Sequence, residues 1–210
     1  MRTRIVIVDD HVSMRDMLAW ILIQDGNYEV IGEAGSGIEA VTVCAVCRPD
    51  LVILDLVLPC ISGTEVMRRV RREVPGTRVL IFSGTSEWAL INEALCERPH
   101  GYVEKMEGLR ILKEAISTIA GGGKFFSTMI SHRLLQGAVS KVAESNLSPR
   151  EREVLQMVAE GRSSKQISGL LNVAVKTVEN HRANLMAKLH KHDVASLTRY
   201  AAGRGMVPLG

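Results

Sequence analysis

The chain has 210 residues, of which 46% are hydrophobic, 23% are charged and only 4% are aromatic. This composition is ordinary for a soluble globular protein, and the length allows one large domain or two small ones. No apolar run approaches the roughly 18 residues that a membrane-spanning helix needs. A strand-like run begins directly after Met1 and Arg2, without the pattern of a signal peptide. We therefore expect a cytoplasmic protein with no membrane partner.

The charge is distributed unevenly along the chain. Residues 147–210 contain ten Lys or Arg and five Asp or Glu, a net charge of +5. The preceding residues contain 16 basic and 18 acidic side chains, a net charge of −2. This contrast predicts two domains with different partners, and the basic one is a candidate for binding nucleic acid.

Two of the four cysteines, Cys44 and Cys47, form a C-A-V-C motif. A redox motif needs an exposed, activated thiolate, usually at the start of a helix. This pair lies near the end of a helical pattern, with no second CxxC and no nearby histidine to complete a zinc site. We interpret both cysteines as structural.

The first 120 residues alternate between two patterns. Short apolar runs, typical of strands, lie at residues 4–10, 28–34, 50–56, 78–84 and 100–105. Apolar residues at helical spacing lie at residues 13–24, 37–46, 62–75, 87–95 and 109–123. Five strands that alternate with five helices predict a doubly wound α/β fold with a five-stranded parallel sheet.

Polar side chains stand where four of these strands end. They are Asp9 and Asp10, Asp55, Ser83 and Lys105. All but Asp55 have a simpler interpretation, as a helix cap, a turn residue or a solvated lysine. The carboxylate of Asp55 follows a long apolar run, where burying it costs free energy unless it is paired. Because such folds place their sites at the carboxyl ends of the strands, we favour a common site.

The chemistry of this set indicates phosphoryl transfer. Three clustered carboxylates call for a hard cation with oxygen ligands, and Mg²⁺ fits. A carboxylate can attack phosphorus and form an aspartyl-phosphate, provided that a cation offsets the repulsion between the two anions. Lys105 would supply a flexible positive charge and Ser83 a hydroxyl donor. The set has no histidine base and no glycine-rich phosphate loop, which disfavours nucleotide hydrolysis.

Residues 1 to about 120 resemble the receiver domain of bacterial response regulators, which has a flavodoxin-like fold. The resemblance rests on Asp9-Asp10, on "DLVLPCISGTE" after the third strand, on Ser83 and on "GYVEK". It implies that Asp55 is the phosphoacceptor and that Gly63 is the glycine of the loop after Pro59.

The same resemblance implies roles for the other site residues. Asp10, helped by Asp9, would bind Mg²⁺ together with Asp55 and the backbone carbonyl of Val57. Ser83 and Lys105 would contact the phosphoryl group. Tyr102 would be the aromatic switch, which turns inward when Ser83 is drawn to the aspartyl-phosphate.

The second half of the chain has a helical pattern throughout. Three glycines at 121–123 break the chain, residues 126–139 have the pattern of an amphipathic helix, and the residues up to 146 resemble a linker. A helix then begins at Ser148, with Pro149 at its first position and Glu151 completing a capping box. Three further helical segments follow, and a short helix, a tight turn and a longer helix with a polar face predict a helix-turn-helix domain.

The longer helix has two distinct faces. Val178, Leu185 and Leu189 share one face, and the opposite face carries Lys176, Glu179, Asn180 and Ala183. An ordinary solvated helix in a small bundle has the same pattern, but the basic charge of this half favours DNA.

Residues 147 to about 208 are similar to the LuxR-type helix-turn-helix of the NarL/FixJ response regulators, through "LSPREREVL", "AEGRSSKQIS" and "LNVAVKTVENHRANLMAKL". The similarity implies base contacts in the major groove for Lys176, Glu179, Asn180 and Ala183, and phosphate contacts for Lys165, Thr177, Arg182 and Lys188. Glu179 stands where lysine is frequent. Because glutamate accepts from cytosine N4 and cannot pair with guanine acceptors, we predict a different base preference from relatives with lysine.

Together these features predict a transcriptional response regulator with a receiver domain at 1–122, a linker at 123–146 and a DNA-binding domain at 147–210. A sensor histidine kinase would phosphorylate Asp55, and a homodimer would place two recognition helices about one turn of double-stranded DNA apart. RNA polymerase is a further expected partner, and no enzymatic activity is expected beyond the receiver's own phosphorylation and dephosphorylation. Two alternatives remain: a DNA-binding protein that works without phosphorylation, and an aspartate-based phosphohydrolase, although Val57 stands where those enzymes usually carry a second carboxylate.

Overall fold

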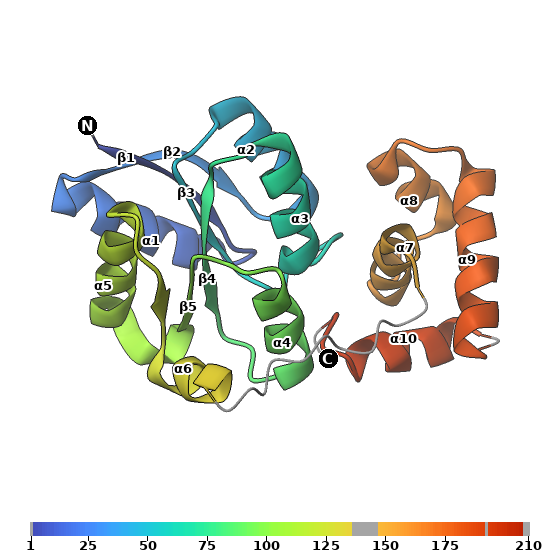
Figure 1. Ribbon diagram of the computed structural model, residues 1–210. Helices are drawn as coiled ribbons and strands as arrows, with labels where there is room; N and C mark the ends of the chain where they lie inside the picture. The colour runs from blue at the N-terminus through green and yellow to red at the C-terminus, as the bar shows by residue number, and fades with distance from the viewer. Residues whose placement is uncertain (1, 136–146, 192, 208–210) are drawn as a thin grey trace.

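The computed structural model describes residues 2–135, 147–191 and 193–207. Its sheet has six parallel strands in the order β2-β1-β3-β4-β5-β6 (Figure 1). The strands are β1 (Thr3–Val8), β2 (Tyr28–Ala34), β3 (Leu51–Leu54), β4 (Arg78–Ser83), β5 (Gly101–Glu104) and β6 (Phe125–Phe126). The predicted doubly wound fold is confirmed.

The prediction of five strands was wrong, because the short strand β6 pairs with β5 at the edge of the sheet. After the three glycines at 121–123 the chain turns back toward the sheet. The N–H of Phe125 then donates to the carbonyl of His100 (3.1 Å), and the N–H of Ser127 donates to the carbonyl of Tyr102 (3.0 Å). Two residues are too few to give an alternating pattern in the sequence.

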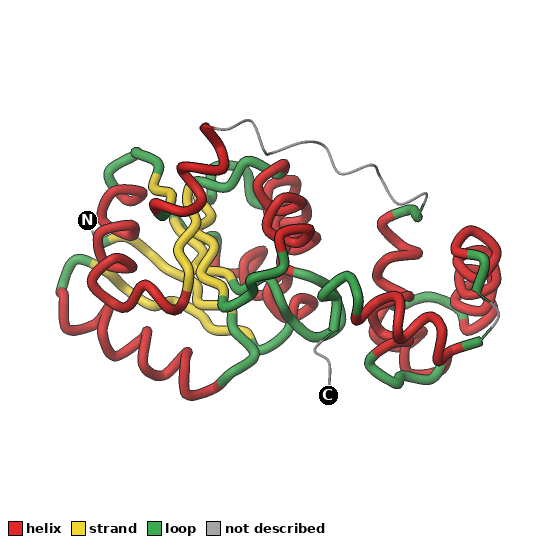
Figure 2. Tube along the Cα trace, turned by 90° about the horizontal axis from the view of Figure 1, so that it is seen from below, coloured by secondary structure: helices red, strands yellow, loops and turns green. Residues whose placement is uncertain are grey.

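Helices cover both faces of the sheet (Figures 1 and 2). One face packs against α1 (Val12–Asp25) and α5 (Gly108–Ala120), and the other packs against α2 (Gly37–Cys47), α3 (Gly63–Glu73) and α4 (Trp88–Cys96). Strand β1 is buried on both sides, since Ile5 and Ile7 belong to one apolar cluster and Val6 and Val8 to the other. This explains why the central strands are apolar without interruption.

The remaining helices follow the sheet. Helix α6 (Thr128–Leu135) covers part of the predicted 126–139 helix, which begins too early because Phe126 belongs to β6, and residues 136–139 lie outside the described residues. The C-terminal bundle consists of α7 (Pro149–Ala159), α8 (Ser164–Leu171), α9 (Val175–Leu189) and α10 (Val194–Ala202). The predicted capping box of α7 is present, and Ser163 and Gln166 form a second one at α8.

The C-A-V-C motif lies in α2, and its geometry supports a structural role. Cys44 is completely buried, and burial raises the pKa of its thiol to about 12. The thiol of Cys47 donates to the carbonyl of Ile31 (3.4 Å), and neither cysteine forms a disulfide. Because its pKa is raised, the thiol of Cys44 stays protonated and is a poor nucleophile and a poor metal ligand.

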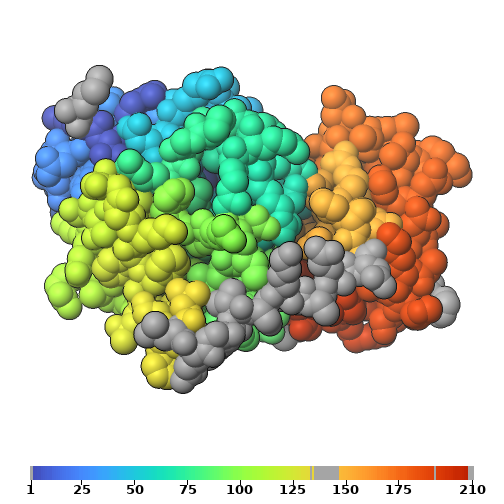
Figure 3. All heavy atoms as spheres, viewed as in Figure 1, coloured from blue at the N-terminus to red at the C-terminus, as the bar shows by residue number. Residues whose placement is uncertain are grey.

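The C-terminal bundle packs against the sheet domain with α7 facing α3 and α4 (Figures 1 and 3). Buried apolar residues of both parts form one continuous cluster. Within the described residues, no helix is long and apolar enough to cross a membrane.

Candidate functional site

Four neighbouring strands bring the predicted site residues to one edge of the sheet. Asp9 follows β1, Asp55 follows β3, Ser83 is the last residue of β4, and Lys105 follows β5. Because these strands are parallel and adjacent in the order β1-β3-β4-β5, their carboxyl ends lie together. The side chains meet there as the strand-end pattern predicts.

Asp55 is bonded through both oxygens of its carboxylate. The hydroxyl of Ser83 donates to Oδ1 (2.5 Å), and the ammonium of Lys105 lies 2.5 Å from Oδ2. The same ammonium lies 2.6 Å from Oδ2 of Asp9. Asp55 and Asp9 are 5% and 2% exposed, so Lys105 is the charge that makes their burial tolerable.

The electrostatics of Lys105 follow from this position. Burial disfavours the charged ammonium, but the two carboxylates, above all that of Asp55, outweigh burial and raise the pKa of Lys105 above its ordinary value. Lys105 therefore stays protonated at neutral pH and holds a positive charge against the oxygens of Asp55.

Asp9, Asp10 and His11 each offer a ligand atom, and these atoms lie within 4.8 Å of one another. Asp10 and His11 are exposed, so a hydrated cation can reach them. Asp55 is not part of this group of three, and its link to the group is the shared contact with Lys105. The carboxylate set suits a hard cation such as Mg²⁺, which keeps several waters.

His11 is the residue that sequence reasoning left out of the site. Its Nδ1 lies 2.7 Å from Oδ1 of Asp10 and 3.3 Å from Oδ1 of Asp9. The sequence analysis expects no histidine base in the set, and the structure adds a histidine beside its acidic pair without testing that expectation. The signal was its position directly after the two aspartates, where the turn from β1 into α1 keeps three consecutive side chains close.

The backbone carbonyl of Val57, a predicted cation ligand, is available. Among the residues that the structure describes, nothing donates a hydrogen bond to it, whereas both neighbouring carbonyls accept one. The N–H of Gly63 donates to Leu56 (2.9 Å), and the side chain of Gln156 donates to Leu58 (2.6 Å). A free carbonyl between two bonded ones fits a cation ligand.

Gly63 holds the first turn of α3 against the backbone of the phosphoacceptor candidate. A Cβ at this position would stand 2.2 Å from the carbonyl oxygen of Asp55, closer than any packing allows. The glycine is therefore required by close approach and not by an unusual backbone angle.

Tyr102 is fully buried, and its hydroxyl has no hydrogen-bond partner within the described ranges. Burial, together with the charges of Glu104 and Asp55, raises the pKa of its hydroxyl well above the ordinary value. The inward position that was predicted for the phosphorylated form is thus the one present in this structure, as is the bond between Ser83 and Asp55.

The two faces of α9 differ as the sequence predicts. Val178 and Leu185 are buried against the bundle. All four predicted base-contacting residues are exposed, and the side chains of Lys176 and Glu179 are 81% and 52% exposed. The receiver-like part of the chain does not cover this face.

The predicted phosphate-contacting residues have more varied surroundings. Lys165 is exposed and Thr177 is half-buried. Arg182 donates to the hydroxyl of Ser164 (3.1 Å), and Lys188 pairs with the buried Glu151 (2.7 Å). Arg182 and Lys188 therefore also tie α9 to α8 and α7.

Comparison with protein families identifies both parts of the chain. Residues 5–117 match the response regulator receiver domain, and residues 145–201 match the bacterial regulatory proteins of the luxR family. The chain belongs to the two-component response regulators that join a receiver domain to a LuxR-type DNA-binding domain, the NarL/FixJ type. It is a transcriptional regulator.

Individual relatives resemble this chain over two thirds of its length or more. The chain is 32% identical to the transcriptional regulatory protein MctR of Rhizobium johnstonii, over 98% of this chain and 96% of the relative. It is 30% identical to a LuxR-family two-component response regulator from Aurantimonas sp. SI85-9A1, whose crystal structure covers 67% of this chain and all of its own, with a TM-score of 0.61. RcsB from Salmonella enterica bound to the promoter rprA shares the fold at 24% identity, with a TM-score of 0.60 over 95% of this chain and 98% of its own.

Proposed function

We propose that Asp55 accepts a phosphoryl group from a sensor histidine kinase, and that this modification controls DNA binding by the LuxR-type domain. The observation that carries the proposal is the pair of contacts on Asp55, one oxygen to the hydroxyl of Ser83 and the other to the ammonium of Lys105. A carboxylate oxygen attacks phosphorus, the P–N bond of the kinase's phosphohistidine breaks, and its electron pair leaves with the imidazole.

Each site residue has a separate task in this step. Asp9, Asp10, Asp55 and the carbonyl of Val57 would hold Mg²⁺, which offsets the repulsion between carboxylate and phosphate when it is bound. Lys105 meets the charge on the transferred group, and Ser83 donates a hydrogen bond to one of its oxygens. The position of Ser83 would decide whether the side chain of Tyr102 can turn inward. This movement of Tyr102 stays a prediction.

The DNA-binding half supplies the output. The exposed face of α9, with Lys176, Glu179, Asn180 and Ala183, enters the major groove, while Lys165, Thr177, Arg182 and Lys188 contact phosphates. A homodimer places two such helices on one DNA site; RcsB dimers have been solved on DNA. RNA polymerase is the further partner, the protein acts in the cytoplasm, and it turns over no substrate beyond its own phosphoryl group.

The domain limits that go with this function are 1–122 for the receiver, 123–146 for the linker and 147–210 for the DNA-binding domain. The described part of this linker contains β6, which pairs with the sheet, and α6, whereas residues 136–146 lie outside the described part of the chain.

Labelling by acetyl phosphate in the presence of Mg²⁺ tests the proposal. Asp55→Asn should abolish the labelling, because an amide is not a nucleophile toward phosphorus. Asp16→Asn, at an exposed position of α1, is the matched control and should label like the parent protein. Persistent labelling of Asp55→Asn would remove Asp55 from this role, and turnover of a phosphomonoester would favour a phosphohydrolase.

A further inference from the structure

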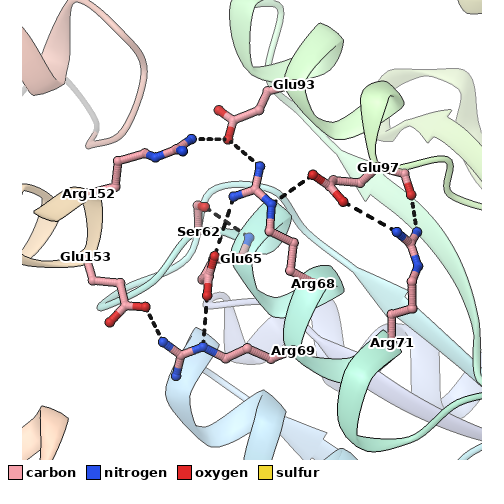
Figure 4. A network of polar contacts seen from close by, with 9 residues as sticks. All are labelled: Ser62, Glu65, Arg68, Arg69, Arg71, Glu93, Glu97, Arg152 and Glu153. Carbon is pink, nitrogen blue, oxygen red and sulfur yellow. Dashed lines mark hydrogen bonds and ion pairs between the residues drawn. The ribbon is translucent and has the colours of Figure 1, made fainter. Parts of the chain in front are cut away.

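The two domains are joined by two separate sets of polar contacts, both made by the first helix of the DNA-binding domain and the turn that follows it. One set, drawn in Figure 4, ties α7 to the helices α3 and α4. Arg69 pairs with Glu153, which is 4% exposed, and Arg152 pairs with Glu93 (3.2 Å). Both interdomain pairs join helix to helix, and the network reaches the β3–α3 loop only at Ser62, whose hydroxyl accepts from the N–H of Glu65 (3.4 Å).

The second set consists of hydrogen bonds to the backbone of the β3–α3 loop, the segment 56–62 that follows Asp55. Nε2 of Gln156 donates to the carbonyl of Leu58 (2.6 Å), and the N–H of Cys60 donates to Oε1 of Glu160 (2.8 Å). The two side chains are joined to each other, since Nε2 of Gln156 also lies 3.1 Å from Oε1 of Glu160. Gln156 is 2% exposed, so water does not replace these bonds in the docked protein.

The loop adopts a conformation that needs such support. Cys60 has a φ of 73°, in the left-handed region that residues with a Cβ rarely adopt. Strained residues persist where the surroundings over-determine them. Here the N–H of Cys60 is bonded to Glu160, and Arg162 fixes the other oxygen of that carboxylate (2.9 Å).

The same contacts restrict the carbonyl of Val57, which is predicted to bind the cation. Val57 lies between two residues whose carbonyls accept hydrogen bonds. The carbonyl of Leu56 accepts from Gly63 of the receiver, and that of Leu58 accepts from Gln156 of the other domain. With both neighbouring carbonyls bonded, and with the N–H of Val57 donating to Oδ1 of Asp55 (3.3 Å), the carbonyl of Val57 has little freedom to turn.

We propose that Gln156 and Glu160 of the DNA-binding domain are positioning residues for the receiver's cation site, acting through the loop that carries the Val57 carbonyl. The inference rests on the proposed function of Asp55. If the cation binds more tightly when the two domains are packed together than when they are apart, then cation binding favours the packed arrangement by the same factor. The exposed face of α9 stays accessible in this arrangement, so the coupling does not depend on covering the recognition helix.

Binding of Mn²⁺ to the full-length protein, measured by electron paramagnetic resonance of the free ion, tests this inference. Mn²⁺ shares the oxygen-ligand preference of Mg²⁺. Gln156→Ala should weaken binding by about 10-fold, the low end of the cost for removing an outer-shell partner of a metal ligand. Gln156→Met keeps the volume of the side chain and removes only the donor, so it should weaken binding equally.

Glu93→Ala is the matched control, because it removes the interdomain pair with Arg152 and leaves the loop contacts in place. It should bind Mn²⁺ like the parent protein. Unchanged binding in both Gln156 variants would overturn the inference. Equal weakening in Glu93→Ala would also overturn it, since docking in general would then be responsible.

Labelling by acetyl phosphate as a function of Mg²⁺ concentration separates positioning from damage. In Gln156→Met the Mg²⁺ concentration for half-maximal labelling should rise about 10-fold, with the maximal rate unchanged. A lowered maximal rate at saturating Mg²⁺ would contradict the inference. Absence of labelling in the parent protein would instead refute the proposed function of Asp55.

Discussion

The acidic site and the recognition helix differ in how their charged side chains are surrounded: those of the site are buried and paired, and those of the helix are exposed. Asp9, Asp55 and Ser83 are almost fully buried; Lys105 compensates the charges of the two carboxylates, and the hydroxyl of Ser83 donates to Asp55. Lys176 and Glu179 stand in solvent, and their only mutual contact is a long ion pair of 3.8 Å. Substitutions in the first region should therefore be coupled and costly, and those in the second should change recognition without changing stability.

The largest expected effect comes from removing the shared cation of the acidic site. Lys105→Met leaves the buried carboxylates of Asp9 and Asp55 without a compensating charge. We expect a loss of about 3 kcal/mol in the free energy of unfolding, the cost of breaking a buried pair by removing one partner. Urea denaturation without divalent cations measures it.

Adding Mg²⁺ gives a second test of the same prediction. Because the cation binds the folded site, it should restore part of the lost stability in Lys105→Met. Lys113→Met, at an exposed position of α5, is the control and should change stability by less than about 0.5 kcal/mol. Equal stability of the two variants would show that Lys105 does not compensate the carboxylates.

The next effect tests how closely α3 must approach the site. Gly63→Ala places a Cβ 2.2 Å from the carbonyl oxygen of Asp55 and forces the helix away. We expect a loss of about 2 kcal/mol, in the range for overpacking, and slower labelling by acetyl phosphate. Thermal unfolding and the labelling rate are the two measurements.

Gly169→Ala in α8 is the matched control for that substitution. Apart from the backbone of its own helix, none of the described residues lies within 4 Å of a Cβ at this position, so alanine should stabilise the helix by about 0.5–1 kcal/mol. If both substitutions moved stability in the same direction, close packing at Gly63 would not be the reason for its glycine.

The strand-end rule found the acidic site because parallel topology brings Asp9, Asp55, Ser83 and Lys105 to one edge. It failed for the contacts between domains. Arg69 lies in the helix predicted at residues 62–75, yet it pairs with Glu153, 84 residues later. No local period marks such a pair, since both side chains look like ordinary surface charges until the two helices pack together.

The third effect lies on the exposed side of the comparison. Glu179→Lys replaces an acceptor for cytosine N4 with a donor for guanine O6 and N7, worth about 1–3 kcal/mol of discrimination at one base pair. Stability should stay within about 0.5 kcal/mol, because the side chain is 52% exposed. Selection of preferred sites from a random DNA library measures the change.

Leu185→Ala, on the buried face of the same helix, provides the contrast. It should lower stability by about 2–5 kcal/mol, the usual cost for a buried leucine. An unchanged preferred site in Glu179→Lys would mean that this residue does not read a base.

The smallest expected effect is a pH dependence inside the DNA-binding domain. Burial alone would raise the pKa of Glu151, but the ammonium of Lys188 and the N–H and hydroxyl at Ser148 lower it below its ordinary value of 4.5. A carboxyl group with a lowered pKa in the folded state stabilises the protein above its unfolded pKa, and this stabilisation is lost as the pH falls through 4.5 toward the folded pKa.

Unfolding by urea between about pH 6 and about pH 3 tests this dependence. In Glu151→Gln position 151 no longer titrates, so the loss of stability on acidification should be smaller than in the parent protein. Glu114→Gln, exposed on α5, should keep the full pH dependence. Because Lys188 is also a predicted phosphate contact, Lys188→Met should weaken DNA binding and flatten the acid dependence together. A variant that weakened DNA binding while keeping the full acid dependence would show that Lys188 binds DNA and does not hold Glu151.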